Sequence, residues 1–195
     1  MGGHFINVAP VVDDEEGYLY LFGSGLYRQS AVYLARKPLK SLTEPGVFEY
    51  CSGLASWSPQ SNMAVPIAEE NSVGELSARH YKRIGIWLLM YARKGQVVLR
   101  AARQPDGPWS QVTKVHSMQD EMFREHYCCG ESFCEGERMI HCNKAGVYAP
   151  YMLPIIAPPA KNGAITVNYL LSTWDPYGTV LMSTDITISG DAPTR

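Results

Sequence analysis

The sequence predicts an all-β protein of antiparallel strands, on three observations. Tyr, Trp, Phe, Gly and Pro are plentiful (12, 4, 5, 17 and 13 residues), a mixture that suits short strands and many turns. Short runs rich in Val, Ile, Tyr and Leu recur along the chain and end at Gly, Pro, Asn or Asp. Helix signals are thin: one short helix is expected at Ser117–Arg124, where a Ser stands at the N-cap position and acids follow.

The expected strands fall into three groups. The first group contains Phe5–Pro10, Tyr18–Gly23, Ser30–Arg36 and Val47–Cys51. The second group contains Val73–His80, Gly85–Ala92, Gln96–Arg103 and Trp109–Val115. The third group contains Val147–Leu153, Ala164–Ser172 and Thr179–Ile186.

The groups repeat one another. The segments YLYLFGSG, WLLMYARK and VNYLLSTW align, with 69 residues from Tyr18 to Trp87 and 80 from Trp87 to Val167. Such a period fits four-stranded propeller blades. We predict one partial β-propeller domain over residues 1–195, with about three blades at 4–53, 73–116 and 147–188 and an insertion at 117–146. An antiparallel sandwich is the alternative fold.

Charge and apolar runs limit the partners. With 17 Lys and Arg against 19 Asp and Glu, the net charge of −2 gives no electrostatic case for nucleic acid. The longest apolar runs, Ile84–Ala92 and Val147–Pro154, are too short to span a bilayer, so no membrane partner is expected. The N-terminus lacks the basic start and apolar core of a signal peptide. The sequence therefore predicts a cytoplasmic chain, or an exported protein without its natural beginning.

The segment VGELSARHY (Val73–Tyr81) holds the candidate catalytic residue. In a strand, Glu75, Ser77 and Arg79 share one face, and on an innermost blade strand that face lines the central channel. Glu75 then serves as acid, base or substrate anchor, steered by Arg79. The alternative is a structural Glu75–Arg79 pair that ties neighbouring blades.

Aromatic residues near loops are candidates for stacking on sugar faces, or pack in the ordinary hydrophobic way. They are Trp57, Tyr148, Tyr151, Trp174 and Tyr177. Arg28, in the Gly-rich connection GSGLYRQS, is a further candidate because it could reach a ligand hydroxyl or pair with an acid.

Glycoside hydrolysis needs two carboxyl groups that flank one glycosidic bond, and the sequence offers no obvious second carboxyl group to act with Glu75. Asp175 begins a turn before a proline, a place that Asp favours for backbone reasons, although it is kept as a substrate-binding candidate. The acidic run at 13–16 is typical of a solvated turn.

Five cysteines are present, four of them in one stretch. They are Cys51, Cys128, Cys129, Cys134 and Cys142. Their irregular spacing leaves three alternatives: disulfides in an exported protein, ordinary thiols in a cytoplasmic one, or structural zinc. Because five is odd, at least one thiol stays unpaired within the chain. Disulfides or ordinary thiols are favoured over zinc, so the sequence predicts no metal site and no cofactor.

Several of these stretches together resemble a known family. They are YLYLFGSGLYRQSAVYLARKPL, VGELSARHYKRIGIWLLMY, VVLRAARQPDGPWS and YAPYMLP with VNYLLSTWDPYGTVLMST. The family is the domain-of-unknown-function group of five-bladed propeller glycoside hydrolases that includes endo-D-arabinofuranases. The resemblance covers roughly residues 4–188 and implies a carbohydrate substrate, usual export and no required redox cofactor.

The resemblance also sets limits. Family members usually have about two further blades before this region, which hold their catalytic aspartates, so no catalytic aspartate is carried onto this sequence. Glu75, Arg79, Trp174 and Tyr177 carry over as positions that line or support the cleft. Asp175 replaces a usual Asn, and Ile155 stands where an Arg often follows the proline. The segment RQPDGPW (Arg103–Trp109) marks the family and is expected to act only as a turn.

Two functions follow as hypotheses. The first is a glycoside-hydrolase-like protein that acts on a furanoside polysaccharide or oligosaccharide and lacks part of its catalytic site. The second is a non-catalytic carbohydrate-binding or self-associating module, because open sheet edges invite pairing with another chain and could yield a homo-oligomer.

Overall fold

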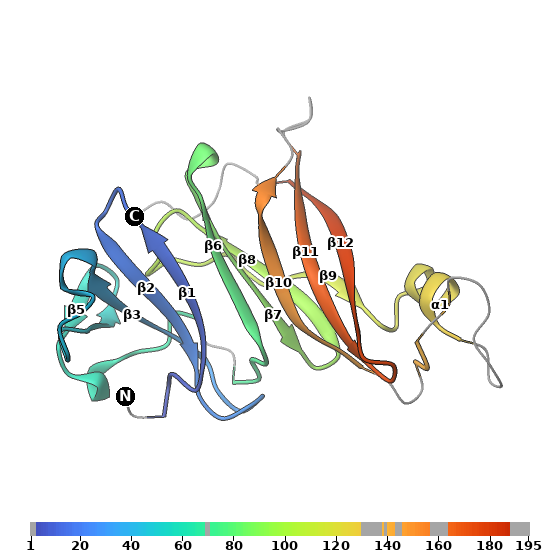
Figure 1. Cartoon of the computed structure of the whole chain (residues 1–195), viewed down its shortest axis with the longest axis horizontal. Coiled ribbons are helices and arrows are strands. Elements are labelled where there is room, and N and C mark those ends of the chain that lie inside the picture. Colours follow the sequence, from blue (N-terminus) through green and yellow to red (C-terminus); the bar gives the residue numbers. More distant parts are fainter. Residues whose placement is uncertain are drawn as a thin grey trace.

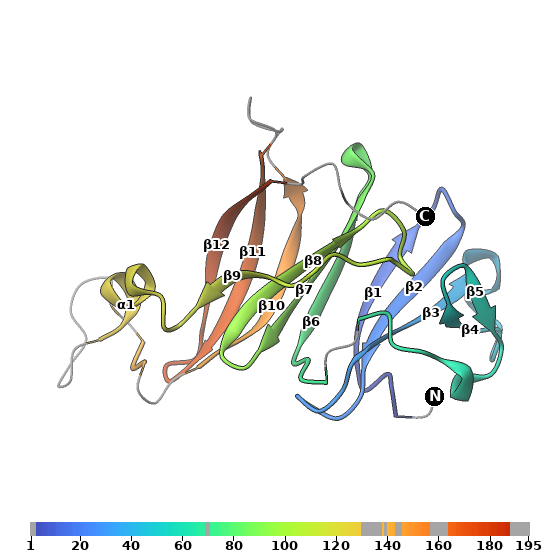
Figure 2. The same cartoon turned by 180° about the vertical axis from the view of Figure 1, so that it is seen from behind.

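The computed structural model describes residues 3–68, 71–129, 138, 140–142, 146–156 and 164–187. Three antiparallel sheets follow one another along the chain and lie side by side (Figures 1 and 2). Their first strands are neighbours: β6 lies between β1 and β10. This arrangement is a partial β-propeller, as the sequence predicts, and each sheet is one blade.

Each blade is a meander whose consecutive strands pair in chain order. The first consists of β1 (Asn7–Asp13), β2 (Tyr18–Ser24), β3 (Val32–Pro38), β4 (Glu49–Gly53) and β5 (Ser56–Ser58). The second consists of β6 (Leu76–Tyr81), β7 (Ile86–Arg93), β8 (Gln96–Ala102) and β9 (Thr113–Ser117). The third consists of β10 (Gly146–Ile156), β11 (Ala164–Trp174) and β12 (Gly178–Thr187). Four strands per blade therefore holds only for the second blade within the described residues.

The blades pack face to face through strand β7. Its side chains alternate between the two faces of the central sheet, as the period of two in a strand requires. Trp87, Leu89 and Tyr91 enter the core shared with the first blade. Leu88 and Met90 enter the core shared with the third blade. Burial on both faces explains why the run IWLLMYA is continuously apolar.

The described part of the connection between the second and third blades contains one short helix, α1 (Glu121–Tyr127). It begins later than predicted because the Asp120 carboxylate accepts a hydrogen bond from the Ser117 backbone N–H at 2.8 Å and closes a turn first. Phe123 of this helix packs against His116, with ring centroids 4.4 Å apart. Short 3-10 helices complete the loops: η1 (Leu39–Ser41), η2 (Ser61–Met63) and η3 (Lys82–Ile84).

Of the three alternatives for the cysteines, the structure shows disulfides for those described in the cysteine-rich stretch. Cys128 and Cys142 are joined with an S–S distance of 2.04 Å, and Cys129 is also disulfide-bonded. Cys51 is a free, buried thiol whose pKa is raised by burial. Cys134 lies outside the described residues. No helix in the described ranges is long and apolar enough to cross a membrane.

Candidate functional site

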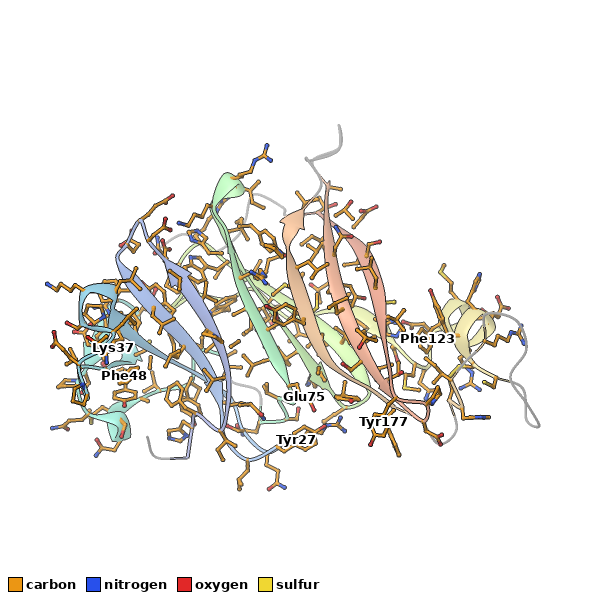
Figure 3. The ribbon with its side chains drawn as sticks, viewed as in Figure 1. Tyr27, Lys37, Phe48, Glu75, Phe123 and Tyr177 are labelled. Atoms are coloured by element: carbon orange, nitrogen blue, oxygen red, sulfur yellow. A yellow bond between two sulfur atoms is a disulfide. The ribbon has the colours of Figure 1, made fainter. Side chains whose placement is uncertain are left out.

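The blades have two ends, which carry different polar and aromatic side chains. We call the end where β1, β6 and β10 begin the N-terminal edge; the β2–β3 loop, Glu75 and the β11–β12 turn lie there. We call the opposite end the C-terminal edge; the residues that follow β1, β6 and β8 lie there. Figure 3 shows Tyr27, Glu75 and Tyr177 along the N-terminal edge.

Glu75 is held firmly at this edge, just ahead of β6. Its carbonyl accepts a hydrogen bond from the Ala92 N–H at 3.1 Å, and the preceding Gly74 N–H donates to the Ala92 carbonyl at 2.8 Å. Any side chain at Gly74 would begin 3.0 Å from that carbonyl oxygen, so glycine suits the close approach. The Oε2 atom of Glu75 is buried and has no hydrogen-bond partner among the described residues. One carboxylate oxygen is thus left for a ligand or a water molecule.

Tyr27 and Arg28 lie beside Glu75 in the β2–β3 loop. The loop is pinned to the second blade, because the Arg28 N–H donates to the Val73 carbonyl and the Val73 N–H to the Ser30 carbonyl, both at 3.1 Å. Burial and then the negative charge of the nearby Glu75 carboxylate raise the pKa of Tyr27. The Arg28 guanidinium lies 4.7 Å from the centre of the Tyr27 ring.

The β11–β12 turn brings aromatic surface to the same edge. Tyr177 is 83% exposed and Trp174 is 46% exposed. A Cβ atom at Gly146 would lie 2.5 Å from Trp174 Nε1, so this glycine lets the indole lie against the start of β10. Asp175 has a φ of 59°, a left-handed conformation that Asp and Asn adopt more readily than most residues. Its place in the turn is therefore explained by the backbone.

Arg79 and Tyr151 tie the second blade to the third. Arg79 Nε donates to the Met152 carbonyl at 2.7 Å, and Nη2 donates to the Tyr151 hydroxyl at 3.2 Å. Ser77 Oγ accepts from the Met152 N–H at 3.0 Å. Arg79 does link neighbouring blades, but through these groups, and no ion pair joins it to Glu75 among the described contacts. Tyr151 and Arg79 line a groove of about 460 Å³ along β1 and β6.

Trp57 lies away from Glu75. It belongs to β5, with the Arg36 guanidinium 3.9 Å from its ring centre, and it lines a cavity of about 640 Å³ at the C-terminal edge. Of the aromatic candidates, Trp174 and Tyr177 share the N-terminal edge with Glu75, whereas Tyr151 and Trp57 line separate hollows.

Asp13 and His80 were not predicted from the sequence as site residues. The side chain of Asp13 is 1% exposed, and its Oδ2 lies 3.0 Å from His80 Nδ1. Asp13 Oδ1 accepts hydrogen bonds from the N–H groups of Glu15 and Glu16 at 3.2 and 3.4 Å. Because alternate residues of a strand share a face, Asp13 lies on the same inward face of β1 as the buried Ala9. This pattern was overlooked because Asp13 begins a run of four acidic residues, which is typical of a solvated turn.

Comparison with known proteins places the chain in a family. The model of the family described as "Domain of unknown function (DUF4185)" matches residues 1–183, and the chain belongs to this family. No curated protein matches the sequence.

Similar solved structures share little sequence with the chain. One from Bacteroides ovatus, described as a candidate hydrolase, has 18% identity and a TM-score of 0.48 over 86% of this chain and 38% of that one. An endo-arabinase from Bacteroides thetaiotaomicron has 9% identity and a TM-score of 0.44 over 96% and 54%. An exo-beta-1,3-galactanase from Phanerochaete chrysosporium has 11% identity and a TM-score of 0.42 over 96% and 44%. The chain thus spans about half the length of these proteins, or less.

Proposed function

We propose that this DUF4185 protein is a glycoside-hydrolase-like protein that binds a furanoside polysaccharide or oligosaccharide, of the arabinan type, at its N-terminal edge. The observation that carries the proposal is Glu75, whose buried Oε2 has no partner among the described residues, beside the exposed rings at the same edge. Sugar hydroxyls donate hydrogen bonds to a carboxylate, and the apolar faces of sugar rings stack on aromatic side chains. The motif resemblance to endo-D-arabinofuranases supports the choice of a furanoside.

Catalysis needs more than Glu75. Hydrolysis of a glycosidic bond uses two carboxyl groups that lie about 5 to 10 Å apart on either side of that bond. Asp175, a second carboxylate at this edge, stands in an exposed turn shaped by the backbone. We therefore propose that the 195-residue chain by itself binds furanosides without hydrolysing them.

The test combines binding and turnover. Calorimetric titration with an arabinofuranosyl oligosaccharide is expected to show saturable binding, weakened about tenfold by Tyr177→Ala and much less by Tyr177→Leu, which keeps apolar area. Incubation with aryl arabinofuranosides and with arabinan is expected to release no product. Robust turnover would overturn the non-catalytic part of the proposal, and absent binding would overturn all of it.

Export is part of the proposal. Disulfides persist mainly in oxidising compartments, and the Cys128–Cys142 bond supports an extracellular or periplasmic protein. Detection of the native protein only in the cytosolic fraction would contradict it.

Self-association is the second candidate function. Within the described residues β12 pairs only with β11, so its other edge presents backbone donors and acceptors, and Leu181 on it is 64% exposed. Light scattering is expected to show a dimer or larger species; a clean monomer at high concentration would count against it.

A further inference from the structure

The cavity of about 640 Å³ at the C-terminal edge lies between the first two blades, away from Glu75. Its volume falls in the range of small-molecule sites, about 300 to 1,000 Å³. The loop after β8 forms part of its wall, through Arg103 and Asp106. This loop belongs to the segment RQPDGPW, so the family-marking turn also lines a cavity.

The walls of the cavity are fixed by contacts between blades. Asp106 is buried, and its Oδ2 accepts a hydrogen bond from the Ala55 N–H of the first blade at 2.6 Å. Asp13 of the first blade binds His80 of the second, and Lys82 Nζ lies 3.7 Å from Asp13 Oδ1. A cavity whose walls are already ordered loses little freedom when a ligand enters.

His80 lines this cavity, and it also lines the groove along β1 and β6. Its ring stacks on Trp87, with centroids 4.4 Å apart and planes 7° from parallel, so the imidazole has a fixed orientation. Nδ1 faces the buried Asp13 carboxylate, which favours the tautomer with the proton on Nδ1. The other nitrogen, Nε2, is then an acceptor, and it has no hydrogen-bond partner among the described residues.

The charges around the cavity favour an uncharged ligand. Three acids (Asp13, Glu16 and Asp106) and two arginines (Arg36 and Arg103) line it. Arg36 is neutralised by Glu49, at 2.7 Å, and the charge of Asp13 is balanced by Lys82, whose Nζ lies 3.7 Å from Asp13 Oδ1. Neither sign dominates, while acceptor oxygens, guanidinium donors and the ring of Trp57 are all present.

We propose that this cavity is a second ligand-binding site, which takes a neutral polyhydroxylated ligand such as a single sugar unit. His80 Nε2 accepts a hydrogen bond from a ligand hydroxyl, and the acids of the wall accept others. The site is separate from the N-terminal edge, and its occupancy does not depend on Glu75.

The test follows the His80 imidazole and the Trp57 indole by NMR while D-galactose or D-arabinose is added. Saturable shifts of both signals are expected in the wild-type protein. D-Galacturonate and inorganic phosphate serve as anionic probes and are expected to bind more weakly. Shifts confined to Tyr27 and Tyr177, tighter binding of either anion, or no shift with either sugar would overturn the proposal.

His80→Asn isolates the role of Nε2. The asparagine amide keeps a donor close to the Nδ1 position, facing Asp13, and removes Nε2. Affinity for the sugar probe is expected to fall roughly five- to tenfold, as loss of one hydrogen bond implies. Unchanged affinity would overturn the assignment to His80, and the wild-type mapping decides the site if this variant does not fold. Glu75→Gln is the control, because it alters only the N-terminal edge and is expected to leave these shifts unchanged.

Discussion

The acidic residues at the two edges of the blades differ in their hydrogen-bond partners. At the N-terminal edge Glu75 keeps a buried carboxylate oxygen without a described partner, and Tyr177 on the same edge is 83% exposed. At the C-terminal edge Asp13 is 1% exposed and is bound by His80 and by two backbone N–H groups. Asp13 therefore serves first to hold the blades together, whereas we propose that Glu75 binds a ligand. Substitutions should therefore cost stability at one edge and binding at the other.

The largest expected loss of stability is that of Asp13→Ala. The change leaves His80, Lys82 and two backbone N–H groups without their shared acceptor. The free energy of unfolding should fall by roughly 3 kcal/mol, the usual cost of removing one partner of a buried charged group. Urea unfolding measures it.

Asp14→Ala is the matched control for this comparison. Asp14 is hydrogen-bonded to Lys82, which lowers its pKa, but its side chain is 77% exposed. An exposed ion pair contributes little, so the variant should unfold at nearly the same urea concentration as the wild type. Equal losses in the two aspartate variants would remove the distinction between a buried anchor and a solvated turn.

Gly146→Ala should displace Trp174 at the N-terminal edge. The added methyl group would lie 2.5 Å from Trp174 Nε1, so the indole must move. We expect a loss of about 1 to 3 kcal/mol in stability, together with weaker oligosaccharide binding. The double variant with Trp174→Ala should recover part of the stability, because the clash is gone; a purely additive double-mutant cycle would contradict the contact.

Arg79→Lys tests the link between the second and third blades. Lysine cannot reproduce the two directed bonds to the Met152 carbonyl and the Tyr151 hydroxyl, so about 1 kcal/mol should be lost in thermal or urea unfolding. Arg103→Lys, at an exposed position with a long 3.5 Å contact, should change stability by less. A larger effect at Arg103 would be the contrary result.

The smallest expected effect is on the pH dependence of stability. Burial lowers the pKa of His116 below its ordinary value, so the unfolded chain binds this proton more readily than the folded one. Stability from this group is present above pH about 6.5 and is lost as the pH falls below it. The fall in Tm between pH 7.5 and 5.5 should be smaller in His116→Met than in the wild type; identical falls would contradict the prediction.

Much of the fold could be predicted from the sequence because strand patterns are local. The repeated middle strands identify the blades, and the apolar run of β7 reflects burial on both faces. Strand β5 was missed because three residues, Ser56–Ser58, carry too little pattern. The candidate site was harder to predict from the sequence. The partners of Asp13 and Arg79 lie 67 to 73 residues away along the chain, and strand spacing does not identify such distant partners.

The most direct test of oligosaccharide binding at the N-terminal edge compares Glu75→Gln with Glu44→Gln in calorimetric titrations with an arabinofuranosyl oligosaccharide. Both variants make the same chemical change, and Glu44 is an exposed residue of the first blade, beyond β3. We expect Glu75→Gln to raise the Kd about tenfold, because it removes a charged acceptor at the site, and Glu44→Gln to leave it unchanged. Equal Kd values for the wild type and both variants would contradict the assignment of the binding site to the N-terminal edge.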